Sequence, residues 1–189
     1  MALKKKNYDL NNMMGLDLFL FSGDRKVGNL PKSPVRKTHP LMAWDVIGLA
    51  LLRAELDRSR EADLKYLRKL AIKCGWTIDL ELLLAEDYEA LVLTDAGQKI
   101  LWVNAGFTAM TGYASGKVTG KFPNMLQGSA TSEATRARIR KKLADKCGFT
   151  ETLVNYRKDQ TPYDCRVKVV PLSNAAGQVT HFIALESED

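Results

Sequence analysis

Residues 120–128 read GKFPNMLQG, and the segments on either side of them decide the fold. Before them, residues 91–113 follow a strand–turn–strand–helix pattern. After them come a basic helix and three strand-like runs. This order of elements is typical of an antiparallel sheet with helices on one face. The sequence therefore predicts an α+β fold with a five-stranded antiparallel sheet.

Local patterns around the motif support each of these elements. β-Branched and aromatic runs predict strands at residues 90–94 and 100–103, with DAGQ as the hairpin turn between them. Capping and stop residues predict helices at residues 104–111 and 131–147, the second with Thr131 or Ser132 as its N-cap. The closing strands are predicted at residues 149–156, 163–171 and 179–186. In the middle one, apolar and charged residues alternate, whereas both alternating sets of the last strand are largely apolar.

The chain divides into three predicted parts. Residues 1–38 form a basic arm rich in glycine and proline, which we expect to be disordered. Its apolar patch at residues 16–21 either docks on a sheet face or is incidental. Residues 39–87 form a helical extension, and residues 88–189 form the sheet domain.

The helical extension opens on a segment that is apolar over most of its surface. Residues 41–56 read LMAWDVIGLALLRAEL, so we expect this helix to be buried on two sides, by the sheet domain and by a second chain. Ser59 is predicted to cap a second helix that stops at Gly75. Thr77 is predicted to cap a third helix over residues 78–86.

Composition excludes several classes of protein. Cys74, Cys147 and Cys165 show no CxxC spacing, which argues against a zinc site or a disulfide framework and favours the reducing cytoplasm. The apolar run at residues 46–52 is too short to cross a bilayer, so no membrane association is expected. The sequence contains no phosphate-binding loop and no nucleophile elbow. We therefore expect no enzymatic activity and no metal.

Residues 67–77 also fit a helix-turn-helix with Gly75 in the turn. The second helix of such a motif, ending in LELLL, is acidic and apolar, whereas a recognition helix needs basic and amide side chains for bases and phosphates. Nucleic-acid binding is therefore disfavoured. A transcription regulator with a DNA-contacting helical segment stays an alternative.

Five short motifs, in this order and spacing, make residues 88–187 resemble a PAS domain. They are residues 94–97 (TDAG), 102–107 (WVNAGF), 110–113 (MTGY), 155–159 (NYRKD) and 177–183 (GQVTHFI). The resemblance implies the PAS fold, preceded here by an N-terminal helical extension. It also implies a sensory or protein-interaction role.

A narrower resemblance links GKFPNMLQG to the light-oxygen-voltage (LOV) branch of that family, which binds flavin. This resemblance rests on Gly120, Leu126, Gln127, Gly128, Arg140 and residues 153–156. By this resemblance Gln127 and Asn155 would bind the flavin ring and Arg140 its phosphate. Four positions depart from the branch: Pro123 replaces the photoactive cysteine, Asn124 a phosphate-binding arginine, Cys165 a ring-binding asparagine, and Glu186 the glutamine that flips its amide.

Each departure weakens flavin chemistry. Proline has no thiol, so no adduct forms at Pro123, and Asn124 lacks the charge that holds phosphate. Cys165 cannot replace an amide, and an inward Glu186 is costly unless it is paired or protonated. The plainer interpretation of Gln127, Asn155 and Cys165 is structural, in a packed core. We therefore expect no bound cofactor, with FMN or FAD as the alternative.

These inferences combine into one functional expectation. The chain is predicted to be a PAS-type sensory or interaction module. It is expected to pair with a second copy through its N-terminal helices and sheet face, and to act on a signalling protein that the sequence does not identify. A flavin-binding blue-light or redox sensor without a cysteinyl adduct is the alternative.

Overall fold

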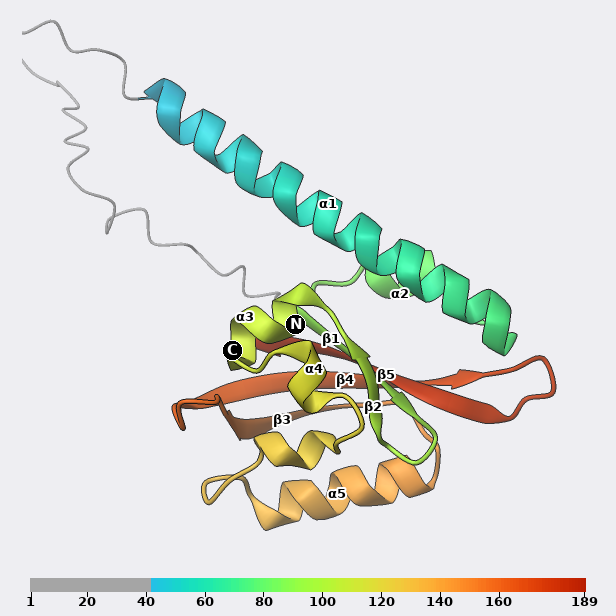
Figure 1. Ribbon diagram of the computed structural model, residues 1–189. Coiled ribbons are helices and arrows are strands. Elements are labelled where there is room, and N and C mark those ends of the chain that lie inside the picture. The colour runs from blue at the N-terminus through green and yellow to red at the C-terminus, as the bar shows by residue number, and fades with distance from the viewer. Residues whose placement is uncertain (1–41) are drawn as a thin grey trace, which may run out of the picture. The chain divides into compact units, whose positions relative to one another are not determined.

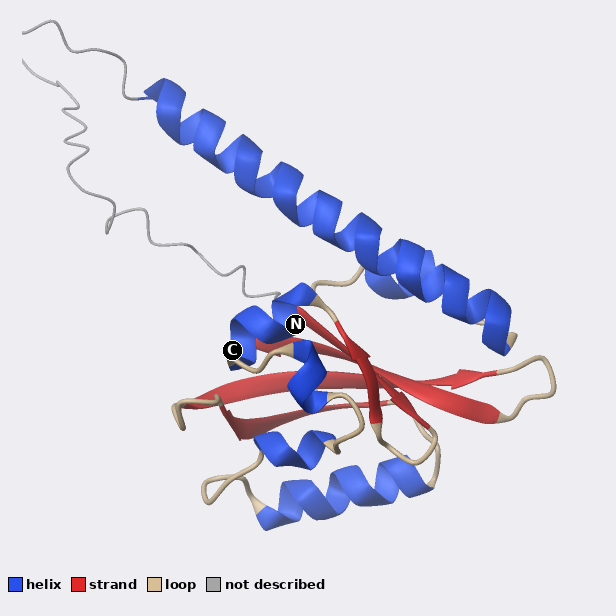
Figure 2. Cartoon of the chain, in the orientation of Figure 1, coloured by secondary structure: helices blue, strands red, loops and turns tan. Residues whose placement is uncertain are grey.

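The computed structural model describes residues 42–189, so the predicted N-terminal arm lies outside the described residues. The elements follow one another as α1 (Met42–Cys74), α2 (Leu80–Leu84), β1 (Ala90–Asp95), β2 (Ile100–Val103), α3 (Ala105–Thr111), α4 (Ser115–Val118), η2 (Pro123–Leu126), α5 (Glu133–Ala144), β3 (Phe149–Tyr156), β4 (Pro162–Ser173) and β5 (Val179–Glu188). Figure 1 labels most of these elements, and Figure 2 separates helices from strands by colour.

The five strands form one antiparallel sheet in the order β2-β1-β5-β4-β3. The last strand of the chain, β5, is therefore central and pairs with β1 and β4. Tight turns allow this arrangement: Asp95 Oδ1 accepts the Lys99 N–H in the β1–β2 hairpin, and Gly177 takes φ 74° between β4 and β5. The predicted PAS fold is confirmed.

Two hydrophobic cores lie on opposite faces of this sheet. On one face, α3, α4, η2 and α5 cover a core that includes Phe107, Val118 and Leu126. On the other face, the C-terminal half of α1 and α2 cover a second core, in which Leu67 and Trp76 meet the strands. Strand β1 serves both cores because Ala90 and Val92 point one way and Leu91 and Leu93 the other.

The helical extension differs from the prediction in where its helices begin. Residues 42–74 form one continuous helix of 33 residues, so Ser59 lies inside α1 and caps nothing. The residues around Ser59 are good helix formers, and no glycine or proline interrupts them between Leu49 and Cys74. The next helix is short, and Asp79, not Thr77, caps it by accepting the Leu82 N–H at 3.0 Å.

From Ile47 to Leu56 the large apolar side chains of α1 are exposed, which contradicts the expectation that the sheet domain buries this segment. Ile47, Leu49, Leu51, Leu52 and Leu56 are between 49% and 66% exposed. In Figure 1 the N-terminal half of the helix extends beyond the sheet. The described chain therefore leaves the large apolar side chains between Ile47 and Leu56 uncovered.

Candidate functional site

A cavity of about 410 Å³ lies between the inner face of the sheet and the segments η2 and α5. Its walls are mostly apolar, with Val92, Phe182 and Ala184 from the central strands and Ile139 and Leu143 from α5. This volume is within the range of small-molecule sites. The expectation of a solidly packed core is therefore wrong for this part of the domain.

Glu186 and Asn155 place polar groups in the cavity wall. Each is only 5% exposed. Glu186 Oε2 and Asn155 Oδ1 have no hydrogen-bond partner among residues 42–189. Burial raises the pKa of the Glu186 carboxyl to about 7. Two buried acceptors without donors are costly in an apolar core, and both border the same cavity.

The motif GKFPNMLQG forms one edge of this cavity. Pro123 begins η2, where its missing N–H costs nothing, and both Pro123 and Asn124 border the cavity. Gln127 follows η2, and its backbone forms an isolated antiparallel bridge with Asn155. The bridge brings the two amide residues of the predicted site to one wall.

The end of the motif is fixed by contact with Tyr156. A Cβ on Gly128 would lie 2.3 Å from the Tyr156 ring, so only glycine fits there. The Tyr156 hydroxyl accepts the Ala130 N–H at 3.0 Å, and Thr131 Oγ1 donates to the Val154 carbonyl at 2.6 Å. These contacts hold the connection from η2 to α5 against β3.

Helix α5 contributes two arginines to the rim of the cavity. Arg140 pairs with Glu133 at 2.6 Å and has an exposed side chain. Arg136, a residue that the sequence reasoning did not select, also borders the cavity. One of its terminal nitrogens donates to the Gly128 carbonyl, while its buried Nε has no partner in the described chain. Its position four residues before Arg140, on the same helix face, was the only available signal.

Cys165 does not border the cavity. It is fully buried in the core, and burial followed by the nearby Glu186 raises the pKa of its thiol. A thiol held in the protonated form is a poor nucleophile. The structure thus brings Gln127, Asn155, Arg140, Asn124 and Glu186 around one cavity and leaves Cys165 behind its wall.

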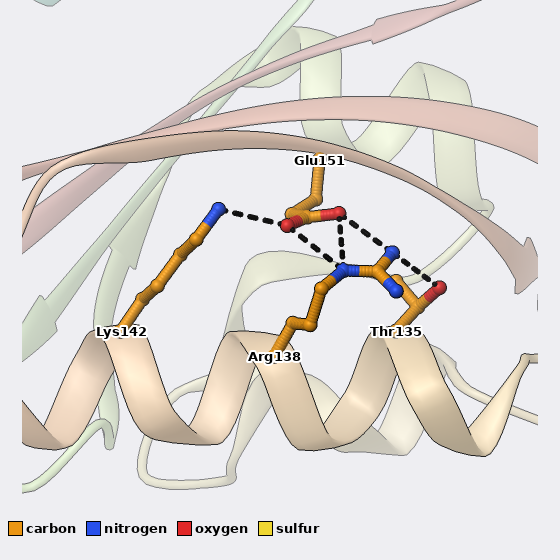
Figure 3. Close-up of polar contacts among 4 residues, drawn as sticks. All are labelled: Thr135, Arg138, Lys142 and Glu151. Carbon is orange, nitrogen blue, oxygen red and sulfur yellow. Dashed lines mark hydrogen bonds and ion pairs between the residues drawn. The ribbon is translucent and has the colours of Figure 1, made fainter.

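An ion-pair cluster fixes α5 over the cavity (Figure 3). Glu151 of β3 binds Arg138 at 2.9 Å and Lys142 at 2.8 Å, and Arg138 also donates to Thr135 at 3.0 Å. Hydrogen bonds from the two cations lower the pKa of Glu151 to about 2. Because its side chain is only 11% exposed, Glu151 depends on both partners for its charge.

A buried polar contact joins α1 to the sheet domain. Asn104 Oδ1 accepts the N–H groups of Leu91 and Phe107, which caps α3 and ties it to β1. The Asn104 amide then donates to Asp63 Oδ2 at 2.9 Å. Asp63 is 6% exposed, and burial raises its pKa. This contact fixes one position along α1.

The helix-turn-helix interpretation fits the packing poorly, because α2 buries Leu80, Leu83 and Leu84 against the sheet. Over residues 42–189, no helix has both the length and the apolarity needed to span a membrane. The same described range holds no group of three or more His, Cys, Asp or Glu residues arranged to bind a metal ion.

The fold and the cavity define a sensor-type domain, and comparison with known proteins identifies its family. Residues 89–187 match the PAS domain, so the chain belongs to the PAS domain family. Phototropin-1A of Oryza sativa subsp. japonica is 32% identical over 113 residues, which cover 58% of this chain and 12% of the phototropin. The nitrogen fixation regulatory protein of Klebsiella oxytoca is 26% identical over 99 residues, which cover 52% of this chain and 20% of that protein.

Solved structures agree. The light-state structure of the blue-light photoreceptor Aureochrome1 LOV matches with a TM-score of 0.54 and 25% identity, covering 59% of this chain and 89% of that one. The PAS domain of the fruit-fly ELK potassium channel matches with a TM-score of 0.51 and 28% identity, covering 53% and 85%. The chain carries a LOV-like PAS domain with proline at the position of the photoactive cysteine, which places it among PAS-type sensory and signalling modules. It spans an eighth or less of the phototropin length.

Proposed function

We propose that this chain is a homodimeric sensory module of the cytoplasm whose output is a change in its own assembly or in a partner signalling protein, without catalysis of its own. The observation that carries this proposal is the exposed apolar segment of α1. Burying a leucine side chain stabilises a complex by about 1.5–3 kcal/mol, and five large aliphatic side chains are exposed between Ile47 and Leu56. Such a patch marks an interaction surface.

A second copy of the chain fits this surface best. The C-terminal end of the apolar segment and the residues just after it carry both signs of charge within one and a half turns: Arg53, Glu55, Asp57 and Arg58. When the same surface meets itself about a two-fold axis, each charge can face its opposite. A partner with a single sign of charge would be repelled by half of these residues.

Light scattering of the full chain in dilute solution tests the proposal, with a dimer as the expected result. Leu49→Glu combined with Leu52→Glu should give a folded monomer, because both side chains lie in the exposed apolar segment. Ile72→Glu is the matched control, since Ile72 is 85% exposed on the same helix but outside that segment, and it should leave the dimer intact. A wild-type monomer would refute the proposal.

A second candidate is a flavin sensor that works without a cysteinyl adduct. It is supported by the cavity and by the positions of Gln127, Asn155 and Arg140 around it. The fit is partial: the rim arginines suit a phosphate, but an ionised Glu186 offers only acceptors where a flavin edge presents its own carbonyl acceptors. The visible spectrum of the protein, with and without added FMN or FAD, tests this candidate. A protein that takes up no flavin rejects it.

A further inference from the structure

The two unpaired acceptors in the cavity are fixed in place by the sheet. Glu186 lies on the central strand, where its backbone is in register with Ala90 of β1 and Val167 of β4, and its carbonyl accepts the Glu89 N–H at 2.8 Å. Asn155 is held in register with Tyr163 and bridges Gln127. Both side chains border the cavity, so a molecule bound there can supply the missing donors.

A carboxylate selects a particular kind of ligand edge. Its two oxygens accept in parallel, so its best partner presents two N–H groups side by side. The amino-lactam edge of a guanine or pterin ring has this pattern, with a ring N–H next to an exocyclic amine. A dione edge, such as that of a flavin, places carbonyl oxygens beside a single N–H and would set oxygen against oxygen at Glu186.

The rest of the cavity defines the remainder of the ligand. Its apolar strand and helix walls suit a flat aromatic ring, and Asn155 Oδ1 accepts a further donor. At the rim, Arg136 and Arg140 suit an anionic substituent. We propose that the cavity binds a flat heterocycle with an amino-lactam edge and an anionic substituent, the chemistry of guanine nucleotides and carboxylated pterins, with the Glu186 carboxylate as its recognition group.

The surroundings of Glu186 agree with this role. The titratable groups that interact with it are Tyr163 and Cys165 of β4, and burial raises the pKa of both, so both are neutral near pH 7. With its own pKa near 7, Glu186 is ionised by a modest gain in hydrogen bonding, which the two N–H groups of the ligand supply. This inference rests on the proposed sensory role, since the ligand would be the signal that the domain senses. It does not depend on dimer formation, which light scattering measures separately.

Calorimetric titration of the full chain at pH 7 with four probes tests the inference. Guanosine monophosphate and pterin-6-carboxylate carry the amino-lactam edge and distinguish the two sources. Inosine monophosphate is the matched control because it lacks only the exocyclic amine, and FMN presents the dione edge. We expect guanosine monophosphate or pterin-6-carboxylate to bind, with inosine monophosphate roughly tenfold or more weaker than guanosine monophosphate, the usual effect of losing one hydrogen bond to a charged group.

Glu186→Gln should reduce the preference for guanosine over inosine monophosphate to within about threefold, because an amide offers one acceptor and one donor. Glu188→Gln makes the same change two residues along β5, at a side chain that pairs with Arg157 outside this cavity, and should keep the preference. If Glu186→Gln does not fold, the ratio of the wild-type protein's affinities for guanosine and inosine monophosphate still tests the inference. Three results would overturn the inference: equal affinity for guanosine and inosine monophosphate, tightest binding of FMN, or no binding of any probe.

Discussion

Replacing Glu151 by glutamine removes the central charge of the cluster that holds α5 over the cavity (Figure 3). The fold lowers the pKa of Glu151 from its ordinary 4.5 to about 2. This shift corresponds to at most roughly 3 kcal/mol of stability at neutral pH. The partners Arg138 and Lys142 are 52% and 39% exposed, so solvent screens part of this energy. We expect Glu151→Gln to lower the free energy of unfolding by about 1–2 kcal/mol at pH 7.

The pH dependence has a definite sign. Because the folded pKa is lowered, the stabilisation is fully present above the unfolded value near 4.5 and is lost as pH falls towards 2. The free energies of unfolding of the wild-type protein and Glu151→Gln, measured in urea between pH 7 and pH 2, should therefore converge in acid. Glu133→Gln is the control, since Glu133 is 69% exposed and pairs only within its own helix. The role given to Glu151 would be refuted if the difference in free energy of unfolding stayed constant down to pH 2, or if there were no difference at pH 7.

Two packing predictions follow from the same structure. A Cβ on Gly106 would lie 1.8 Å from the Glu89 carbonyl oxygen, so Gly106→Ala should destabilise the domain by about 2–4 kcal/mol in thermal or urea unfolding. Gly116→Ala in α4 meets nothing within 4 Å and should be neutral or slightly stabilising, and equal effects of the two changes would contradict the packing. Leu67→Ala leaves a cavity at a fully buried position between α1 and the sheet and should lower the free energy of unfolding by about 2–5 kcal/mol. Ile72→Ala, at a position that is 85% exposed, should lower it by less than about 0.5 kcal/mol. Similar losses of stability for the two variants would show that α1 does not pack on the sheet.

The sheet was predictable because alternation is a local signal. Tyr163, Cys165 and Val167 point inward as their spacing indicates. The doubly apolar pattern of the last strand had no explanation in the sequence, and the structure supplies one. Phe182 enters the core under α5 while Ile183 enters the core under α1, so both faces of β5 are covered.

The helix boundaries and the site were harder to predict, for physical reasons. Serine is both a good N-cap and a tolerable helix residue, so Ser59 alone does not distinguish a helix start from a helix interior. Arg136 differs from its basic neighbours on α5 only in facing the cavity, and no local pattern marks that orientation. The resemblance to the LOV branch drew attention to Cys165, but which side chains reach a cavity depends on strands that meet only in the folded chain.

Strand β5 connects the cavity to the helix that carries the proposed dimer surface. Its side chains alternate: Ala184 and Glu186 border the cavity, whereas Ile183 and Leu185 pack in the cluster that contains Leu67 of α1. A ligand that draws Glu186 inward must therefore act on a strand whose opposite face holds α1. Because packed cores resist continuous deformation, we expect such a movement to reach the helix. The same alternation that made β5 difficult to assign from sequence is what places the cavity and α1 on two faces of one strand.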